Sequence, residues 1–133
     1  MKKLSITLLL LFFAIKGFAQ ETDASRNFDP SFVHTVFFWL KNPDNTADRA
    51  NFESALATLL SKSKFAKTNF VGVPPKATRD VVDDSFTYQL TLTFDSAQAQ
   101  EGYQTEPAHL KFIEDASALW QKVVVYDAQG AVQ

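Results

Sequence analysis

The sequence predicts an α+β domain in which helices cover one face of a four-stranded antiparallel sheet. Three patterns indicate this class. Apolar and polar residues alternate from Phe86 to Phe94, as on a half-buried strand. Apolar residues recur at helical spacing from Thr46 to Lys62. Pro107 can open a second helix, which precedes a closing apolar strand at Lys122–Tyr126.

The first half of the chain predicts strand, helix and strand in turn. Phe32–Leu40 is rich in β-branched and aromatic residues, which favour a strand. Turn residues at 42–45 supply a cap for the helix that follows. A short strand at Asn69–Val73 must end at Pro74, because proline cannot continue a central ladder. Residues 76–85 then form a charged loop.

The second half again predicts a strand, helical segments and a closing strand. After the strand at Phe86–Phe94, Asp95 or Ser96 can cap a short helix running through Gln100 to Tyr103. The helix that starts at Pro107 is expected to continue to about Leu119. The predicted order is β-α-β-β-α-β, the ferredoxin-like pattern, in which two helices cover only one face of the sheet.

The N-terminal segment has the three parts of a signal peptide. Lys2 and Lys3 precede an apolar run at Leu4–Ala14, and a small-x-small cleavage site ends at Ala19. No second hydrophobic stretch follows, so we expect an exported protein, periplasmic or secreted, that keeps no membrane anchor and starts at Gln20. The predicted organisation is a signal peptide at 1–19, a flexible segment at 20–31, one domain at 32–127 and a C-terminal tail at 128–133.

Composition excludes several classes of function. The chain has no cysteine, which excludes disulfides, thiol catalysis and thiolate metal sites. Without the three lysines of the predicted signal peptide, 13 − 3 = 10 basic residues face 15 acidic ones, a net charge of −5 that disfavours nucleic-acid binding. The two histidines lack metal-ligand spacing, so neither a metal nor a cofactor is predicted. The acidic residues at 80–84 are interpreted as a solvated loop, with weak calcium capture as the alternative.

Both faces of the first and last strands are apolar, which bears on assembly. Val33, Phe37 and Trp39 lie opposite the set that begins with Phe32 and His34. Because the helices can cover only one face, we expect a second copy to cover the other and form a homodimer through the sheet faces. The alternative is a monomer, in which the threonines of the third strand make that face wet enough.

The sequence of the predicted domain resembles the stress-responsive dimeric α/β-barrel family, Dabb. The resemblance covers about Phe32 to Asp127 and implies ferredoxin-like protomers that pair into a dimeric α/β barrel. Glu106 stands where members often carry a histidine or another polar residue. The most specific matches are Phe94-Asp95-Ser96, Tyr103, Pro107-Ala108-His109, Trp120 and the closing Val-Val-Val-Tyr-Asp.

The resemblance also implies a catalytic pair, Tyr103 and His109, with His34 nearby, as in polyketide-cyclase members. The residues themselves allow this role. His109 would be the third residue of its helix, on an inward stripe, where an apolar wall and a helix N-terminus favour a neutral ring that can accept a proton. Tyr103 could donate to an oxyanion. The alternative is that both are core residues. The stripe comprises His109, Phe112, Ile113, Ala116 and Trp120.

Two functional hypotheses follow, beside a purely structural dimer with a filled core. In the first, an aromatic-lined cavity binds a small apolar or phenolic ligand, with His34, Phe112, Ile113 and Trp120 as contacts. In the second, His109 is the base and Tyr103 the oxyanion donor of a cofactor-free cyclase, isomerase or lyase. Binding is preferred, because a fold does not transmit a function.

Overall fold

The structure, a computed structural model, describes residues 31–130. The predicted signal peptide and nearly all of the predicted flexible segment lie outside the described residues. The elements in chain order are β1 Phe32–Leu40, α1 Thr46–Lys62, β2 Thr68–Gly72, β3 Tyr88–Phe94, α2 Ala97–Thr105, α3 Pro107–Ala116, the 3₁₀ turn η2 Ser117–Leu119 and β4 Trp120–Gln129.

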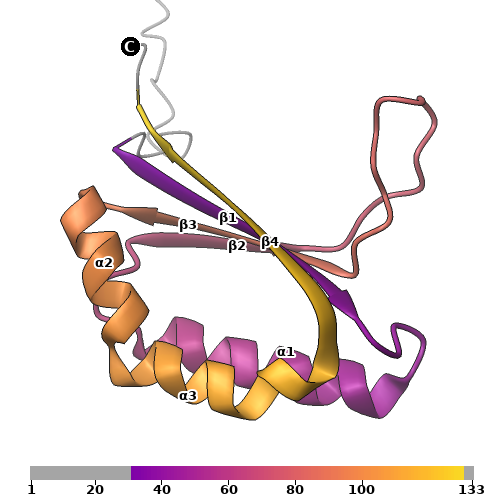
Figure 1. Cartoon of the computed structure of the whole chain (residues 1–133), viewed down its shortest axis with the longest axis horizontal. Coiled ribbons are helices and arrows are strands. Elements are labelled where there is room, and N and C mark those ends of the chain that lie inside the picture. The colour runs from indigo at the N-terminus through magenta and orange to yellow at the C-terminus, as the bar shows by residue number, and fades with distance from the viewer. Residues whose placement is uncertain (1–30, 131–133) are drawn as a thin grey trace, which may run out of the picture.

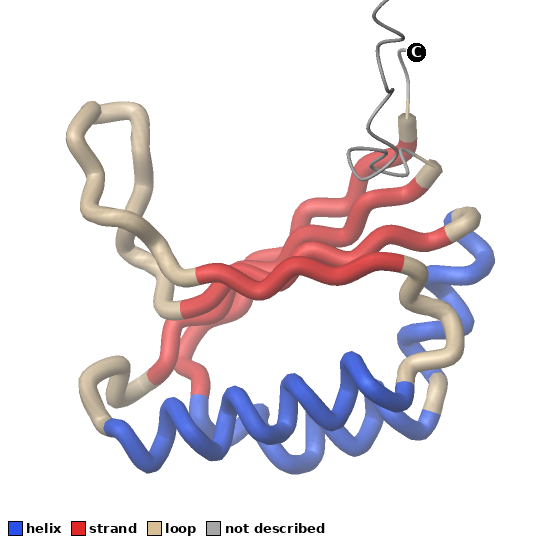
Figure 2. The backbone as a smooth tube through the Cα atoms, turned by 180° about the vertical axis from the view of Figure 1, so that it is seen from behind, coloured by secondary structure: helices blue, strands red, loops and turns tan. Residues whose placement is uncertain are grey.

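The four strands form one antiparallel sheet in the order β2-β3-β1-β4. All three α-helices lie on one side of this sheet (Figures 1 and 2). The predicted α+β class and ferredoxin-like order are therefore confirmed. No helix in the described part of the chain is both long and apolar enough to span a membrane.

The core lies between the helix-side face of the sheet and the helices. Phe52 of α1 stacks on Tyr88 at a centroid distance of 4.9 Å and meets Phe38 of β1 edge-on at 5.0 Å. Each such ring contributes about 1.5–3 kcal/mol by leaving water. The buried apolar residues are Phe32, Val36, Phe38, Leu40, Phe52, Leu56, Leu59, Tyr88, Leu90, Leu92, Phe94, Tyr103, Phe112 and Ala116.

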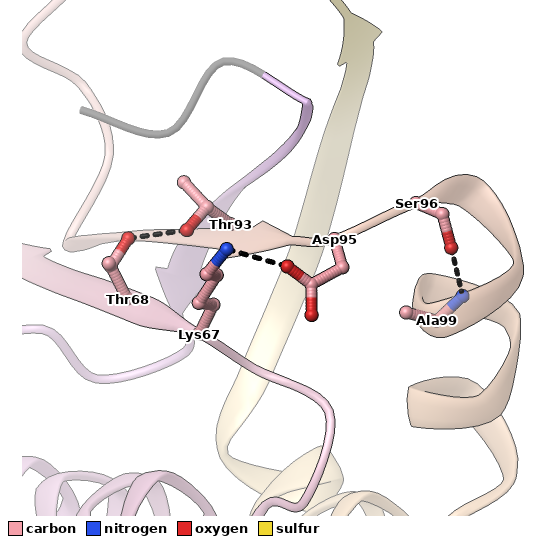
Figure 3. A network of polar contacts seen from close by, with 6 residues as sticks. All are labelled: Lys67, Thr68, Thr93, Asp95, Ser96 and Ala99. Atoms are coloured by element: carbon pink, nitrogen blue, oxygen red, sulfur yellow. Dashed lines mark hydrogen bonds and ion pairs between the residues drawn. The ribbon is translucent and has the colours of Figure 1, made fainter. Parts of the chain in front are cut away.

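Local chemistry sets the start of α1 and of α2. The Asn45 side chain accepts hydrogen bonds from the backbone N–H of Ala47 and Asp48, as the turn at 42–45 predicted. Figure 3 shows the corresponding corner at α2, where Ser96 Oγ accepts from the N–H of Ala99 at 3.1 Å.

An ion pair beside this corner ties the turn before α2 to the neighbouring strand (Figure 3). Lys67 Nζ lies 2.6 Å from Asp95 Oδ1, and the hydroxyls of Thr68 and Thr93 hydrogen-bond across β2 and β3 at 2.5 Å. The turn into α2 is thus held against the sheet edge, and α2 carries Tyr103 back toward the sheet.

Several predicted boundaries are wrong. The helix from Pro107 ends at Ala116 instead of about Leu119, because the chain tightens into η2 and then pairs with β1 from Trp120 onward. The last strand is longer than predicted at both ends and extends from Trp120 to Gln129. The short helix is also longer than predicted and extends from Ala97 to Thr105.

The outer sheet face, opposite the helices, follows from the strand register. Phe37 pairs with Val124 and Thr35 with Tyr126, so these four share the outer face. Val125 pairs with the buried Val36 and faces the helix side instead. The loop between β2 and β3 rises away from the helices beyond this outer face (Figures 1 and 2).

Candidate functional site

A cavity of about 200 Å³ lies between the helix-side face of the sheet and the corner where α2 meets α3. Gln104, Ile113 and Val125 are exposed lining residues, so the cavity opens between this corner and the edge strand β4. The full lining is His34, Val36, Phe38, Leu90, Tyr103, Gln104, His109, Phe112, Ile113, Trp120, Val123 and Val125.

Tyr103 is a buried residue in the lining of this cavity. The side chain is only 2% exposed, and its ring centroid lies 4.5 Å from His109 and 5.8 Å from His34. Within residues 31–130 the hydroxyl has no hydrogen-bond partner, yet no fully buried polar side-chain atom of these residues is unpaired. The hydroxyl is therefore not fully buried and remains accessible to solvent or to a small molecule. Burial, and then the charge of Glu106, raises the pKa of Tyr103, so the group stays a neutral donor.

His109, the third residue of α3, is held in one tautomer. Its Nδ1–H donates to the carbonyl oxygen of Gln104 at 3.1 Å, and a carbonyl can only accept. In the neutral ring Nε2 is therefore a free acceptor. Burial is the largest cause that lowers the pKa of His109, and His34 adds to it; the Gln104 carbonyl and Glu106 act in the opposite direction. The ring is therefore neutral at pH 7, with Nε2 carrying the lone pair that can accept a proton.

His34 forms a dyad with an acid that the sequence analysis missed. His34 Nδ1–H donates to Asp127 Oδ1 at 2.5 Å, from adjacent strands where the two residues are direct partners. His34 is buried, whereas the carboxylate of Asp127 is partly exposed at the edge. The sequence pattern did not pair them, because the pairing depends on the register of the two strands and Asp127 lies beyond the predicted strand Lys122–Tyr126. The other ring nitrogen of His34, Nε2, has no hydrogen-bond partner within residues 31–130.

The predicted ligand contacts all line the cavity, but not in the predicted way. Phe112 is buried as expected. Trp120 was assigned to the helical stripe, yet it is the first residue of β4, because α3 has already ended. Ile113 is 39% exposed and lies at the opening, not on the inner wall. The roles of these side chains, and of Tyr103 and His109, stay predictions.

Glu106 has a structural position outside the cavity lining. Its carboxylate accepts from the Ser63 hydroxyl at 2.6 Å and from the Lys64 N–H at 2.9 Å. It thereby joins the α2–α3 corner to the end of α1. Since Tyr103 and His109 stand on either side of this corner, Glu106 positions both.

Two further observations limit the chemistry. No group of three or more histidine, cysteine, aspartate or glutamate side chains within residues 31–130 could hold a metal ion. A larger groove of about 460 Å³ between α1 and α3 is lined by neither histidine nor tyrosine, and its charged rim is mostly lysine. The smaller cavity is the one in which acid–base groups converge.

Fold and site together define a ferredoxin-like α+β protein with a ligand-sized cavity between its sheet and its helices. Residues 32–129 match the stress responsive A/B barrel domain, so the chain belongs to that family. This match confirms the resemblance drawn from the residues. No curated protein matches the chain in sequence.

Solved structures share the fold at low sequence identity. A protein from Arabidopsis thaliana superposes with a TM-score of 0.64 and 20% identity, over 77% of this chain and 97% of the other. A hydroxynitrile lyase from Passiflora edulis has a TM-score of 0.64 and 21% identity, over 75% and 94%. A protein from Bacteroides fragilis described as dimeric has a TM-score of 0.60 and 18% identity, over 77% and 99%. At these identities the likeness extends to the fold alone.

Proposed function

We propose that the protein binds a small, mainly apolar molecule carrying one polar oxygen, such as a phenol or an aryl carbonyl compound. The observation that carries this proposal is a set of polar atoms on residues that line an apolar cavity, none of which has a hydrogen-bond partner within residues 31–130: the Tyr103 hydroxyl and Nε2 of His34 and of His109. A filled core would pair or exclude such atoms, because an unpaired buried polar group costs about 1–3 kcal/mol.

The cavity size limits the ligand to about one ring. Apolar cavities of about 150 Å³ accept benzene, so about 200 Å³ has room for one substituted aromatic ring. Phe38, Phe112 and Trp120 offer it aromatic walls. The ligand oxygen would accept from Tyr103, and a ligand hydroxyl would donate to one of the two imidazoles.

Calorimetric titration with phenols, benzaldehydes and saturated alcohols of equal size tests binding. Tyr103→Phe should weaken the best ligand by about 1 kcal/mol, roughly fivefold, since one hydrogen bond is lost. Tyr88→Phe is the matched control, because its hydroxyl donates to Glu53 and lies outside the cavity. Equal affinity of parent and Tyr103→Phe, with a lower melting temperature, would make Tyr103 a core residue.

The His34–Asp127 dyad favours a second candidate, a cofactor-free acid–base enzyme. A carboxylate on Nδ1–H fixes the tautomer and leaves Nε2 of His34 as the nitrogen that can accept a proton. With His109 as base and Tyr103 as donor, the site would hold two proton acceptors around one ligand oxygen. A hydroxynitrile lyase has this fold, so cyanohydrin cleavage is the reaction to test first.

In that reaction a base takes the hydroxyl proton, the C–CN bond breaks with its electron pair on cyanide, and an aldehyde forms. Cyanide then takes the proton. With mandelonitrile as probe, His109→Gln should lower turnover by about 10²-fold, the scale of a lost general base. Asp127→Asn should lower kcat by misorienting His34, whereas the α3 variant Asp115→Asn serves as the control. An inactive parent would exclude this reaction and leave binding as the function.

We also propose that the protein works as an exported homodimer. The apolar outer sheet face and the structural relatives described as dimeric support pairing through that face. The sequence pattern at 1–19 supports export. Intact mass of protein recovered from outside the cytoplasm should correspond to a chain starting at Gln20; an uncleaved chain retained with membranes would contradict export.

A further inference from the structure

The loop at residues 73–87, here called the arm, rises from the sheet on the side away from the helices (Figures 1 and 2). Connections of this length without regular structure are uncommon in compact domains, and those that are ordered usually have a function. The arm stands at one end of the outer sheet face and rises beyond it (Figures 1 and 2).

The arm is braced by its own hydrogen bonds. The N–H of Ala77 donates to Asp84 Oδ2 at 2.7 Å, the N–H of Ser85 to Asp83 Oδ1 at 2.8 Å, and the N–H of Val82 to the Arg79 carbonyl at 3.0 Å. These bonds fix its shape without using the rest of the domain. The conformation of the arm is therefore formed within the single protomer, without a partner.

The base of the arm is joined to the outer sheet face. Trp39 Nε1–H donates to Ser85 Oγ at 3.1 Å, and Phe86 meets Phe37 edge-on at a centroid distance of 4.9 Å. A hollow of about 260 Å³ lies at this base, between aromatic rings of the face and the arm. Lys122 Nζ covers the Trp39 ring at 4.2 Å. The arm and the outer face thus form one continuous surface.

Two valines of the arm, unlike Val82 and Phe86, have little cover within residues 31–130. Val81 is 86% exposed, the highest value among the exposed large apolar residues of the described chain, and Val73 is 57% exposed. A preformed loop that holds valines in water, beside an apolar sheet face, is a surface that a partner must cover.

We propose that the arm embraces the second copy of this chain, and that Val81 becomes buried against the partner subunit when the outer faces meet. The inference rests on the homodimer proposed above and extends it. Sheet-to-sheet contact alone would leave the arms projecting past the interface, because they rise beyond the face that pairs. In the proposed dimer, the second copy instead packs against both the outer sheet face and the arm of the first. Two-fold symmetry makes the same contacts a second time, with the arm of the second copy against the first.

Sedimentation equilibrium on the full mature chain tests this proposal. It compares two single variants, each of which replaces one exposed apolar residue with aspartate. Val81→Asp should weaken the dimer at least tenfold, because the carboxylate would lose water at the interface. Leu110→Asp is the matched control: Leu110 is 55% exposed on α3, on the side away from the outer face, and its variant should dimerise like the parent. Val81 is so exposed that the change does not threaten the fold of one protomer.

Labelling gives a second measurement, since the chain has no cysteine of its own. A polarity-sensitive dye on Val81→Cys should shift to shorter emission wavelength as the protein is concentrated into dimers, and the same dye on Leu110→Cys should not. If the parent is a dimer, but Val81→Asp has no effect and the dye emission does not shift, the proposed contact between the arm and the partner is wrong while the dimer itself stands. A parent that is monomeric throughout would overturn both.

Discussion

At the scale of single residues, Tyr103, His109 and His34 differ from Thr87 and Glu106, which are also buried or partly buried polar side chains. Thr87 and Glu106 are buried with their hydrogen bonds made inside the protomer. Each of the three cavity residues instead keeps one polar atom unpaired among residues 31–130. That contrast distinguishes a site from a polar core.

His109 makes stability depend on pH in a defined window. Because burial lowers its pKa in the folded state, the unfolded chain takes up the proton first as the pH falls. Stability from the neutral ring is complete above the unfolded pKa of about 6.5 and declines below it, toward the lower folded pKa. The melting temperature of the parent should therefore fall, relative to His109→Gln, from pH 7.5 to 5.5. Parallel curves for the two proteins would contradict the lowered pKa.

Glu106 should matter for stability, with its effect on the site passing through the α2–α3 corner. In Glu106→Ala the Ser63 hydroxyl and the Lys64 N–H would both lose their acceptor. We expect a loss of about 1–3 kcal/mol in unfolding free energy by denaturant titration. Glu101→Ala, an exposed change on α2, should stay within about 0.5 kcal/mol. Equal stability of the two variants would contradict the role given to Glu106.

The site could be predicted only in part from the residues. Tyr103 and His109 were identified from the resemblance and from helical spacing, and His34 from the first strand. Asp127 was missed because its relation to His34 depends on strand register, which a single strand pattern does not reveal. The fold, in contrast, follows from periodicities that are local.

At the scale of elements, boundaries set by side-chain chemistry were predicted better than those set by pairing. Asn45 and Pro107 start helices where expected, because a cap or a proline acts on its own turn. The end of α3 was misplaced since apolar spacing continues to Trp120, while the chain leaves the helix to pair with β1. Lys41 N–H donates to the Leu119 carbonyl at 2.9 Å at this crossing, a tertiary contact that no helix pattern encodes.

The cap of α1 offers a direct test of the local argument. Asn45→Ala removes the acceptor for two backbone N–H groups and should cost about 0.5–2 kcal/mol of stability. Asn51→Ala, at an exposed position inside the same helix, should be neutral or slightly stabilising, because alanine is the better helix former. Both are measured by thermal unfolding. A destabilised Asn51→Ala beside an unchanged Asn45→Ala would place the helix start elsewhere.

At the scale of the whole molecule, helices cover one sheet face, whereas the other carries aromatic and valine side chains, beside the polar Gln89, Thr91 and Thr93, that no other element of residues 31–130 covers. Phe70 and Tyr126 are exposed on it, and Phe37, Trp39 and Val124 are only partly buried. The sequence indicated this imbalance but could not say which valine of strand four faces outward. The register now assigns Val124 to the outer face and Val125 to the cavity opening.

The two valines make the sharpest test of assembly. Val124→Asp places a carboxylate on the outer face, where a partner would remove it from water without a counter-charge at a cost of several kcal/mol. If the parent is a dimer at micromolar protein concentration, sedimentation velocity should show Val124→Asp as a monomer at the same concentration. Val125→Asp, one residue along the same strand, should leave the dimer intact and weaken ligand binding, because the charge stands at the cavity opening. If Val125→Asp were the variant that separates the protomers, the interface would lie at the helix side of β4, and the partner would close the cavity instead of the sheet face.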